Sequence, residues 1–409
     1  MTNNCKFYKD NNRCFYGKNK IHIGTKNKLD MMEKYIKSWP MKILNSGMGY
    51  KGVIFVDAMC GPGEYIYIEE LKKEIIKGTS LRVYNILSRY SDNPKMQNAF
   101  LMLNDYDEKT IECQMCRIER ESKKYYPQKV KVDYSCKDIS DYIDYIIKEL
   151  SKYPDYHILF FYDPYKADVR WKDLEKLFRK ENNIRSRIDI IITHFHQNDP
   201  GRAIPSGIKK IETRNRYEQT YDMDLELIKK EIYGLKGFKR SKWFRDRMVE
   251  LMSRYFKVSK NLIAYAPIFN SRDSSVYDIV FFSHSKRAKD LFKSSIHKTI
   301  FEQKKQKHAV QQLSLDLYGV NDSNPLIEYN KDSDIFYSIE YYAKYIIENF
   351  SGFTKVSTKE LDEFLSDHPF IPSQGINKEL DRILKKENVL ITQKREEGKN
   401  YSFPYLGSC

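Results

Sequence analysis

Val53-Ile-Phe-Val-Asp57-Ala-Met-Cys60-Gly61-Pro-Gly63-Glu64-Tyr65 is the stretch of this chain that decides its fold. An apolar, β-branched run ends in a carboxylate and then breaks at two closely spaced glycines. Buried parallel strands present nucleotide-type ligands at their carboxyl ends in this way. The glycines let the backbone approach a ligand without an intervening Cβ, and Asp57 can accept a hydrogen bond from a cationic or hydroxyl group. Gly61-x-Gly63 also occurs in ordinary turns, so the rest of the chain must supply the specificity.

Length and composition set the class of protein. With 409 residues, two domains are expected. Charged residues make up 31% and the mean hydropathy is -0.67, and no apolar run approaches the roughly 18–20 residues that span a bilayer. The amino terminus has no apolar leader, so we expect a soluble, cytoplasmic protein without a membrane partner. The seven cysteines lack regular pairing and read as reduced thiols; Cys113-x-x-Cys116 lies where a helix is expected, and no metal site is predicted.

The positive charge is large and uneven. The formal net charge is +15 and the pI is about 9.1. Residues 202–260 contain 16 Lys and Arg against 8 Asp and Glu, and residues 286–308 contain 8 against 2. Such a surplus can bind a polyanion through counterion release. It can also be lysine solvated on helix surfaces, and the composition leaves both interpretations open.

Strand and helix patterns alternate through five units, which predicts an α/β fold with a doubly wound, mostly parallel sheet of Rossmann-like type. A helical segment within residues 1–50 is expected to pack on this sheet. The sheet domain is expected over 51–315, with a helical insertion at about 202–258. Residues 64–77 are expected to be an insertion between the glycine loop and its helix. The strands are predicted at 52–58, 99–103, 130–134, 157–162 and 188–193, with two late strands at 261–266 and 276–282.

Residues 334–409 have a pattern of their own, which we interpret as a winged-helix-like domain. Three helical stretches precede a charged hairpin, and Ser357 with Glu360 forms a capping box for the second helix. Basic side chains on the third helix, among them Lys378, Arg382 and Lys385, lie where such folds meet duplex backbone. Packing on a partner protein is the alternative for this domain. A domain boundary is expected in the polar stretch 316–334.

Carboxylates follow each of the first four predicted strands: Asp57, Asp105 or Asp107, Asp138 and Asp163. In a doubly wound sheet these strand ends line one crevice. A dinucleotide needs a third glycine near position 66, where the chain has Ile66, and there is no triphosphate loop. S-adenosylmethionine carries a positive sulfonium and no phosphate, which suits a glycine loop surrounded by acids. We therefore predict that it is bound by Asp57, Cys60, Gly61, Gly63, Asp105, Asp107 and Asp138.

Asp163-Pro164-Tyr165 is the second specific element. It is similar to the Asp-Pro-Pro-Tyr loop of amino-methyltransferases, in which the acid and a proline carbonyl accept hydrogen bonds from the target amine and the aromatic ring stacks on the base. These three residues are the predicted catalytic set. The second proline is absent here, and a strand-to-helix turn is the alternative. His194 and His196 follow the fifth strand near the same crevice and are predicted to contact substrate rather than a metal.

Together these elements resemble the three-Cys-motif partner protein family, a group of bacterial proteins with a methyltransferase-like sheet. The resemblance is carried by Phe55-Val-Asp57 with Gly61-Pro-Gly63, by Gly78-Thr-Ser80, by Phe161-Tyr-Asp163-Pro-Tyr165 and by the strand 277–284. Cys60, Leu81 and Lys166 depart from the family pattern and weaken the catalytic assignment more than the fold. The family name implies a partner protein that has a cysteine motif like that of radical S-adenosylmethionine enzymes.

Two functions follow as hypotheses. The first is an S-adenosylmethionine-dependent methyltransferase that modifies an amino group on DNA or RNA. The alternative is a non-catalytic subunit that senses the cofactor or binds nucleic acid beside a three-Cys-motif partner. A nuclease is disfavoured, because no lysine-bearing nuclease motif accompanies the scattered acids.

Overall fold

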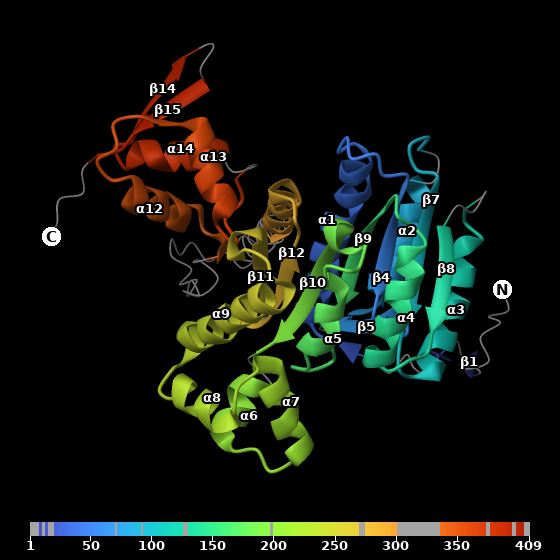
Figure 1. Ribbon diagram of the computed structural model, residues 1–409. Coiled ribbons are helices and arrows are strands. Elements are labelled where there is room, and N and C mark those ends of the chain that lie inside the picture. Colours follow the sequence, from blue (N-terminus) through green and yellow to red (C-terminus); the bar gives the residue numbers. More distant parts are fainter. Residues whose placement is uncertain are drawn as a thin grey trace, which may run out of the picture.

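The computed structural model describes residues 8–9, 13–14, 20–69, 72–90, 93–125, 130–196, 199–269, 275–300, 336–373, 377–394 and 398–404. A seven-stranded sheet forms its centre, with helices on both faces (Figure 1). None of the helices in these ranges is long and apolar enough to cross a membrane. The predicted domain boundary at 316–334 lies outside the described residues.

The central sheet is mostly parallel, as the sequence predicted. Its order is β11-β12-β10-β9-β4-β7-β8. The five strands from β8 to β10 pair in parallel, whereas β12 runs antiparallel to both of its neighbours. The strands are β4 (Gly52–Asp57), β7 (Asn98–Asn104), β8 (Val130–Ser135), β9 (Tyr156–Tyr162), β10 (Ile188–Phe195), β11 (Ile263–Phe269) and β12 (Ser275–Phe282).

Two hydrophobic cores lie on opposite faces of this sheet, because successive side chains of a strand point to opposite sides. Phe55 belongs to one core and Ile54 to the other. The first face is covered by α1 (Ile23–Leu44), α2 (Thr79–Tyr90) and α3 (Glu108–Ser122). The second is covered by α4 (Ile139–Ser151), α5 (Trp171–Glu175) and α9 (Gly237–Phe256). Single 3-10 turns lie at Lys176–Phe178, Arg185–Arg187 and Lys260–Leu262.

The carboxyl ends of β4 and β9 form the switch point of the sheet. Counted along the chain, the parallel strands have the order 3-2-1-4-5, so the connections leave in opposite directions from these two neighbours. The chain continues from β4 to α2 on one face and from β9 to α5 on the other. Divergent connections open a crevice at this edge, which is where open α/β sheets bind their ligands.

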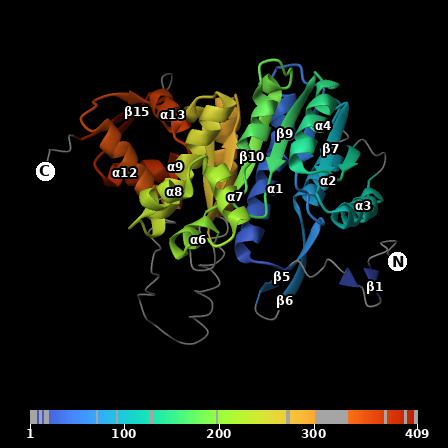
Figure 2. The ribbon, with the colours of Figure 1, turned by 60° about the horizontal axis from the view of Figure 1, so that its bottom comes forward.

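Residues 64–77, expected as an insertion, form a β-hairpin. Its strands are β5 (Glu64–Glu69) and β6 (Lys72–Lys77), and β3 (Lys20–Ile21) adds a third strand beside β5. Figure 2 shows this hairpin projecting from one end of the central sheet. The short strands β1 (Tyr8–Lys9) and β2 (Arg13–Cys14) pair with each other.

The predicted helical insertion forms a small cluster with its own core. Helices α6 (Pro200–Ser206), α7 (Ile211–Tyr221) and α8 (Leu225–Ile232) pack with the start of α9 around Ile204, Tyr217, Tyr221 and Phe244. The chain enters the cluster directly from β10 (Figure 1). These helices therefore extend the molecule beside the carboxyl end of the sheet.

The tail contains the three helices and the hairpin that the sequence predicted. They are α12 (Ile339–Phe350), β13 (Val356–Ser357), α13 (Thr358–Asp367), α14 (Asn377–Lys386), β14 (Leu390–Lys394) and β15 (Gly398–Ser402). The strands form a sheet of order β13-β15-β14. The capping box between Ser357 and Glu360 is confirmed, with both of its hydrogen bonds present.

Two buried lysines join this tail to the sheet domain. Both lie on the helical segment 286–300. Lys293, whose side chain is 0% exposed, donates to the carbonyls of Leu365, Ser366 and His368 at 2.8–3.1 Å. Lys289 donates to the Asp367 carbonyl at 3.0 Å. Cations at the last carbonyls of a helix satisfy unpaired acceptors and oppose its dipole, so the end of α13 is fixed to the core.

We predict that Lys293→Met destabilises the protein by about 2–4 kcal/mol, because buried carbonyls and the Asp290 carboxylate lose their donor. Denaturant unfolding followed by fluorescence measures this change. Lys298→Met is the matched control, since Lys298 is exposed on the same helical segment, and it should change stability by less than about 0.5 kcal/mol. Equal effects of the two substitutions would contradict the role given to Lys293.

Candidate functional site

The glycine loop after β4 has a backbone that only glycine adopts easily. Gly61 and Gly63 have φ angles of 61° and 86°. A Cβ on Gly61 would lie 2.5 Å from the Tyr65 hydroxyl, and one on Gly63 would collide with the amide of Gln114. The N–H of Gly78 donates to the Gly63 carbonyl at 2.7 Å. The loop is therefore held against the start of α2.

Asp57 ends β4 inside the protein. It is 1% exposed, and Ser80 of α2 donates a hydrogen bond to its Oδ2 at 2.7 Å. Burial raises the pKa of Asp57, the Ser80 hydrogen bond lowers it and the nearby Asp163 carboxylate raises it, so that the net pKa is about 7. Asp57 thus changes its charge near neutral pH, at the switch point of the sheet.

Asp105 lies directly after β7 and supports the glycine loop. Its Oδ2 accepts the Gly61 N–H at 3.0 Å, and its Oδ1 accepts the Asp107 N–H at 3.1 Å. Burial raises the pKa of Asp105. Tyr106, the next residue, is 81% exposed. The adjacent Cys60 is buried, and its N–H donates to the Asn104 carbonyl at 2.8 Å.

Asp107 and Asp138 are engaged as helix caps. Asp107 accepts the Lys109 N–H at the start of α3. Asp138 accepts the Ser140 N–H at the start of α4 and also pairs with Arg170 at 3.0 Å. A capping carboxylate stabilises a helix by satisfying its first N–H groups. The structure therefore gives both side chains a structural role at the same sheet edge as Asp57.

Asp163 follows β9 and forms an ion pair that the sequence analysis missed. Its partner is Lys28 of α1, which is 6% exposed. The other oxygen of Asp163, Oδ1, is buried without a hydrogen-bond partner among the described residues. One signal could have identified Lys28: it lies four residues before Met32, on the apolar face of α1. A lysine at such a position needs a buried partner.

Two hydrogen bonds hold the backbone of the loop that carries Pro164 and Tyr165. The N–H of Ala167 donates to Asp199 Oδ2 at 2.9 Å, and the N–H of Val169 donates to the Thr220 hydroxyl at 3.1 Å. Tyr165 itself is 89% exposed. The loop thus presents an aromatic ring to solvent from an anchored backbone, beside the Lys28–Asp163 pair.

Tyr65, from the hairpin strand β5, is a second residue that the sequence analysis missed. Its hydroxyl lies against Gly61. Burial raises the pKa of Tyr65, and the carboxylates of Asp163 and Asp57 add to the shift. The hairpin therefore brings a phenol into the group of acids at the switch point.

His194 and His196 belong to a buried polar cluster on β10 and β12. His194 Nε2 lies 3.1 Å from the Tyr221 hydroxyl, and His196 Nε2 lies 3.3 Å from Asp278 Oδ2. Arg245 donates to Asp278 at 2.9 Å. Burial lowers the pKa of His194 to about 3. Burial would raise the pKa of Asp278, but Arg245 and the histidines outweigh it and hold that pKa below its usual range.

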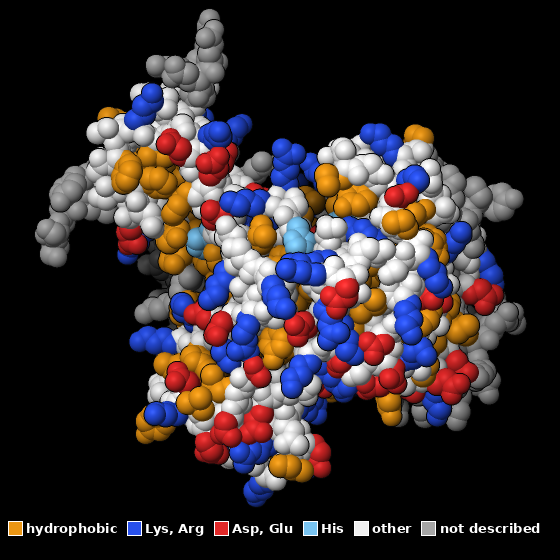
Figure 3. All heavy atoms as spheres, viewed as in Figure 1, with side chains coloured by type: hydrophobic (Ala, Val, Ile, Leu, Met, Phe, Trp, Pro, Cys, Tyr) orange, Lys and Arg blue, Asp and Glu red, His pale blue; other side chains and the backbone are white. Residues whose placement is uncertain are grey.

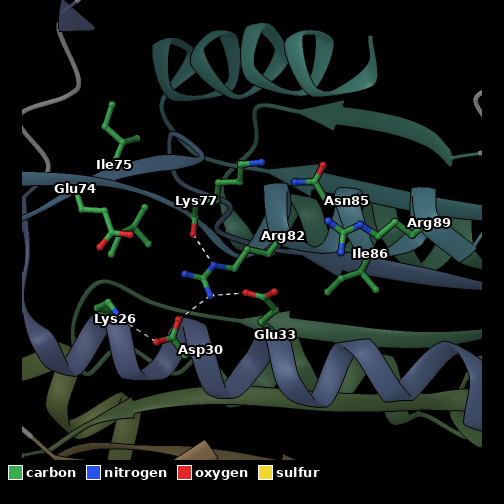
Figure 4. Close-up of a pocket in the computed structure, with 11 residues that line it drawn as sticks. Lys26, Asp30, Glu33, Glu74, Ile75, Lys77, Arg82, Asn85, Ile86 and Arg89 are labelled. Atoms are coloured by element: carbon green, nitrogen blue, oxygen red, sulfur yellow. Dashed lines mark hydrogen bonds and ion pairs between the residues drawn. The ribbon is translucent and has the colours of Figure 1, made fainter. Parts of the chain in front are cut away.

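A charged pocket of about 290 Å³ lies between α1, β6 and α2 (Figure 4). Its charges largely compensate one another. Arg82 donates to Asp30 at 2.8 Å, to Glu33 at 2.7 Å and to the Lys77 carbonyl at 2.8 Å. These contacts fix α1 against α2, and so hold Lys28, on the inner face of α1, at the switch point.

The basic surplus is not gathered on the face seen in Figure 3, where Lys and Arg alternate with Asp and Glu. On α14, by contrast, Lys378, Arg382 and Lys385 are all exposed, at positions that share one side of a helix. No ion pair between described residues involves any of the three. They remain the predicted nucleic-acid contacts of the tail.

Comparison with known proteins gives limited support. No family model matches the chain, and no curated protein matches it. The likeness to the three-Cys-motif partner family is therefore a resemblance of sequence motifs alone. One similar solved structure is the methyltransferase domain of bacterial CtHen1-C, at 14% identity and a TM-score of 0.30, over 63% of this chain and 100% of that one. The mixed α/β fold with its large, mostly parallel sheet agrees with the doubly wound sheet that the sequence predicted.

We predict that Asp57→Asn stabilises the protein at alkaline pH. The folded-state pKa of about 7 lies above the ordinary 3.8, so the folded state binds more protons than the unfolded state between these values. Wild-type stability should therefore fall, relative to the variant, as the pH rises from about 4 to 7. At pH 8.5 the variant should be more stable by about 1–3 kcal/mol, after allowing for an unpaired amide.

Urea unfolding at pH 5 and pH 8.5 tests this prediction. Asp155→Asn is the control, because Asp155 is exposed at the opposite end of the sheet. Its ion pair with Lys51 at 2.7 Å is also exposed, so its loss should change stability only slightly. A stability difference between wild type and Asp57→Asn that stays constant with pH would show that Asp57 does not titrate in this range.

Proposed function

We propose that this protein binds S-adenosylmethionine at the carboxyl ends of β4 and β9 and transfers its methyl group to an amino group in nucleic acid. The observation that carries the proposal is the charge at the switch point. Asp57 and Asp163 lie at neighbouring strand ends, and among the described residues Lys28 forms an ion pair with Asp163 but not with Asp57. The two carboxylates together thus lack one positive charge.

The raised pKa of Asp57 follows chiefly from its burial, and the neighbouring Asp163 carboxylate adds to the shift. With no second cation nearby, the buried site holds a proton on Asp57 up to a pH of about 7. A ligand with a fixed positive charge can replace that proton. The sulfonium of S-adenosylmethionine is such a charge, and the glycine loop beside Asp57 allows close backbone approach. NAD carries a pyrophosphate, which these acids would repel.

The Asp163-Pro164-Tyr165 loop supports amine chemistry. A carboxylate oxygen and a proline carbonyl can accept the two hydrogens of an amino group and orient its lone pair toward the methyl donor. Asp163 Oδ1 is buried and has no partner among the described residues, so it is available to such an amine. The exposed ring of Tyr165 offers a surface on which a base can stack.

Nucleic acid is the proposed substrate because of the tail and the overall charge. The exposed Lys378, Arg382 and Lys385 on α14 would contact phosphates if the tail binds as a winged helix. The resemblance to the three-Cys-motif partner family adds a proposed protein partner, similar to a radical S-adenosylmethionine enzyme.

A second candidate is favoured by the Lys28–Asp163 ion pair. The Lys28 ammonium pairs with Asp163 Oδ2. The second proline of the amino-methyltransferase loop is absent from this chain. A subunit that binds the cofactor without transferring methyl would fit this arrangement. Tight cofactor binding without methyl transfer on any substrate, together with co-purification of a cysteine-motif protein, would favour this function.

Cofactor binding is predicted to depend on pH. Calorimetry should show affinity for S-adenosylmethionine rising by up to about tenfold per pH unit between pH 5.5 and 7, because Asp57 must release its proton. S-adenosylhomocysteine has no sulfonium and should show a much weaker dependence. Asp57→Asn should remove the difference between the two ligands. Tight NAD binding with no affinity for either would sink the proposal.

Methyl transfer is predicted to require Asp163. Tritiated S-adenosylmethionine should label DNA or tRNA with the wild-type protein, and Asp163→Asn should slow labelling by about a hundredfold or more. Asp168→Asn changes the same functional group five residues along the loop and should keep most of the activity. Label found only in protein or small molecules would refute the substrate class.

A further inference from the structure

A cavity of about 120 Å³ lies at the end of β10, between α6 and the first turns of α9. His196, Arg202 and Arg240 contribute its ionisable side chains, and none of the residues that line it is acidic. Neither the methyl-transfer site nor the tail uses this cavity. Its lining chemistry is that of an anion site.

The two arginines are placed differently. Arg240 is fixed, because its Nε donates to the Leu235 carbonyl at 2.8 Å and its Nη1 donates to the Gly201 carbonyl at 2.7 Å. Arg202 is exposed and forms no ion pair with the described residues. A fixed guanidinium and an exposed one can bind an oxyanion together, since guanidinium groups match its geometry.

The amino-terminal turn of α9 adds to this field. The helix has 20 residues, Gly237 and Ser241 line the cavity, and the first turn contains no acid. Lys236 at the N-cap forms no side-chain cap. The first N–H groups of a helix have no intrahelical acceptor, and the helix dipole favours an anion there.

His196 supplies an independent sign of a missing ligand. It is 1% exposed, and its Nε2 lies against Asp278 and the Ser275 hydroxyl. Its Nδ1 has no hydrogen-bond partner in the described part of the chain. A buried ring nitrogen is ordinarily satisfied. His196 is one of the residues that line the cavity. The Asp278 carboxylate takes a hydrogen bond from Nε2, so Nδ1 donates to an anion in the cavity when the ring carries both of its protons.

We propose that this cavity binds a phosphate group. The identity of this phosphate rests on the proposed function: it belongs to the nucleic-acid backbone beside the target nucleotide. Asp199, which precedes α6, accepts the Ala167 N–H of the loop that carries Asp163 and also pairs with Arg216 at 3.2 Å. Asp199 thus links the start of α6, which contributes Gly201 and Arg202 to the cavity, to the loop that carries Asp163.

The test uses the full chain and two probes. Inorganic phosphate should raise the melting temperature of the wild-type protein, and Arg202→Gln and Ser241→Asp should lose this stabilisation, because they remove a donor and place a carboxylate at the helix start. Lys209→Gln is the matched control: Lys209 is exposed close by and does not line the cavity, so its response to phosphate should remain.

Fluorescence anisotropy with labelled DNA and RNA is the second measurement. Arg202→Gln should reduce the slope of log K against log salt by roughly 0.7–0.9, which is the change expected for the loss of one phosphate contact. Lys209→Gln should leave the slope closer to that of the wild type. Phosphate binding with an unchanged nucleic-acid slope would keep the anion site and overturn the backbone assignment. No response to phosphate in the wild type would overturn the site itself. If phosphate stabilisation and the salt slope both behave as expected but the wild-type protein transfers no methyl group, the anion site stands and the proposed function is wrong.

Discussion

A buried carboxylate, a partly buried one and a single ammonium lie together at the switch point of the sheet, and the site depends on that imbalance. Asp57 and Asp163 end neighbouring parallel strands, and Lys28 of α1 pairs with Asp163 alone. Burial of the remaining carboxylate raises its pKa to about 7. An arrangement that costs stability persists where function requires it. The proposed cofactor would bring a positive charge to this unmatched carboxylate, which is why its binding is expected to be linked to a proton.

The elements around the crevice keep these groups in place. Arg82 ties α1 to α2, which fixes the position of Lys28. The N–H of Gly78 binds the Gly63 carbonyl, and Ser80 binds Asp57. The hairpin β5–β6 lies between these contacts and brings Tyr65 against Gly61. One short segment contributes the glycine loop, the hairpin and the start of α2. A ligand at Asp57 would therefore affect the positions of all three.

The loop after β9, the helical cluster and the tail, which are distant in sequence, are joined by specific contacts. The loop after β9 is anchored by Asp199 and Thr220 of the helical cluster. The tail is fixed by Lys289 and Lys293, which cap the last turn of α13. Phe336, before α12, packs at 4.6 Å from the Arg245 guanidinium, which in turn binds Asp278. Movement of the tail would therefore reach the polar cluster beside the cavity.

The sequence by itself determined the sheet, the order of its strand and helix units, the tail elements and the sheet edge that carries the acids. It could do so because alternation, glycine spacing and capping boxes are local signals. Only the tertiary structure decided which polar groups meet. Lys28 and Asp163 are 135 residues apart, and Asp107 and Asp138 proved to cap helices. Tyr65 reaches the site on the β5–β6 hairpin, which the sequence pattern predicted only as an insertion. Partners of this kind depend on how layers pack, and no local spacing encodes that.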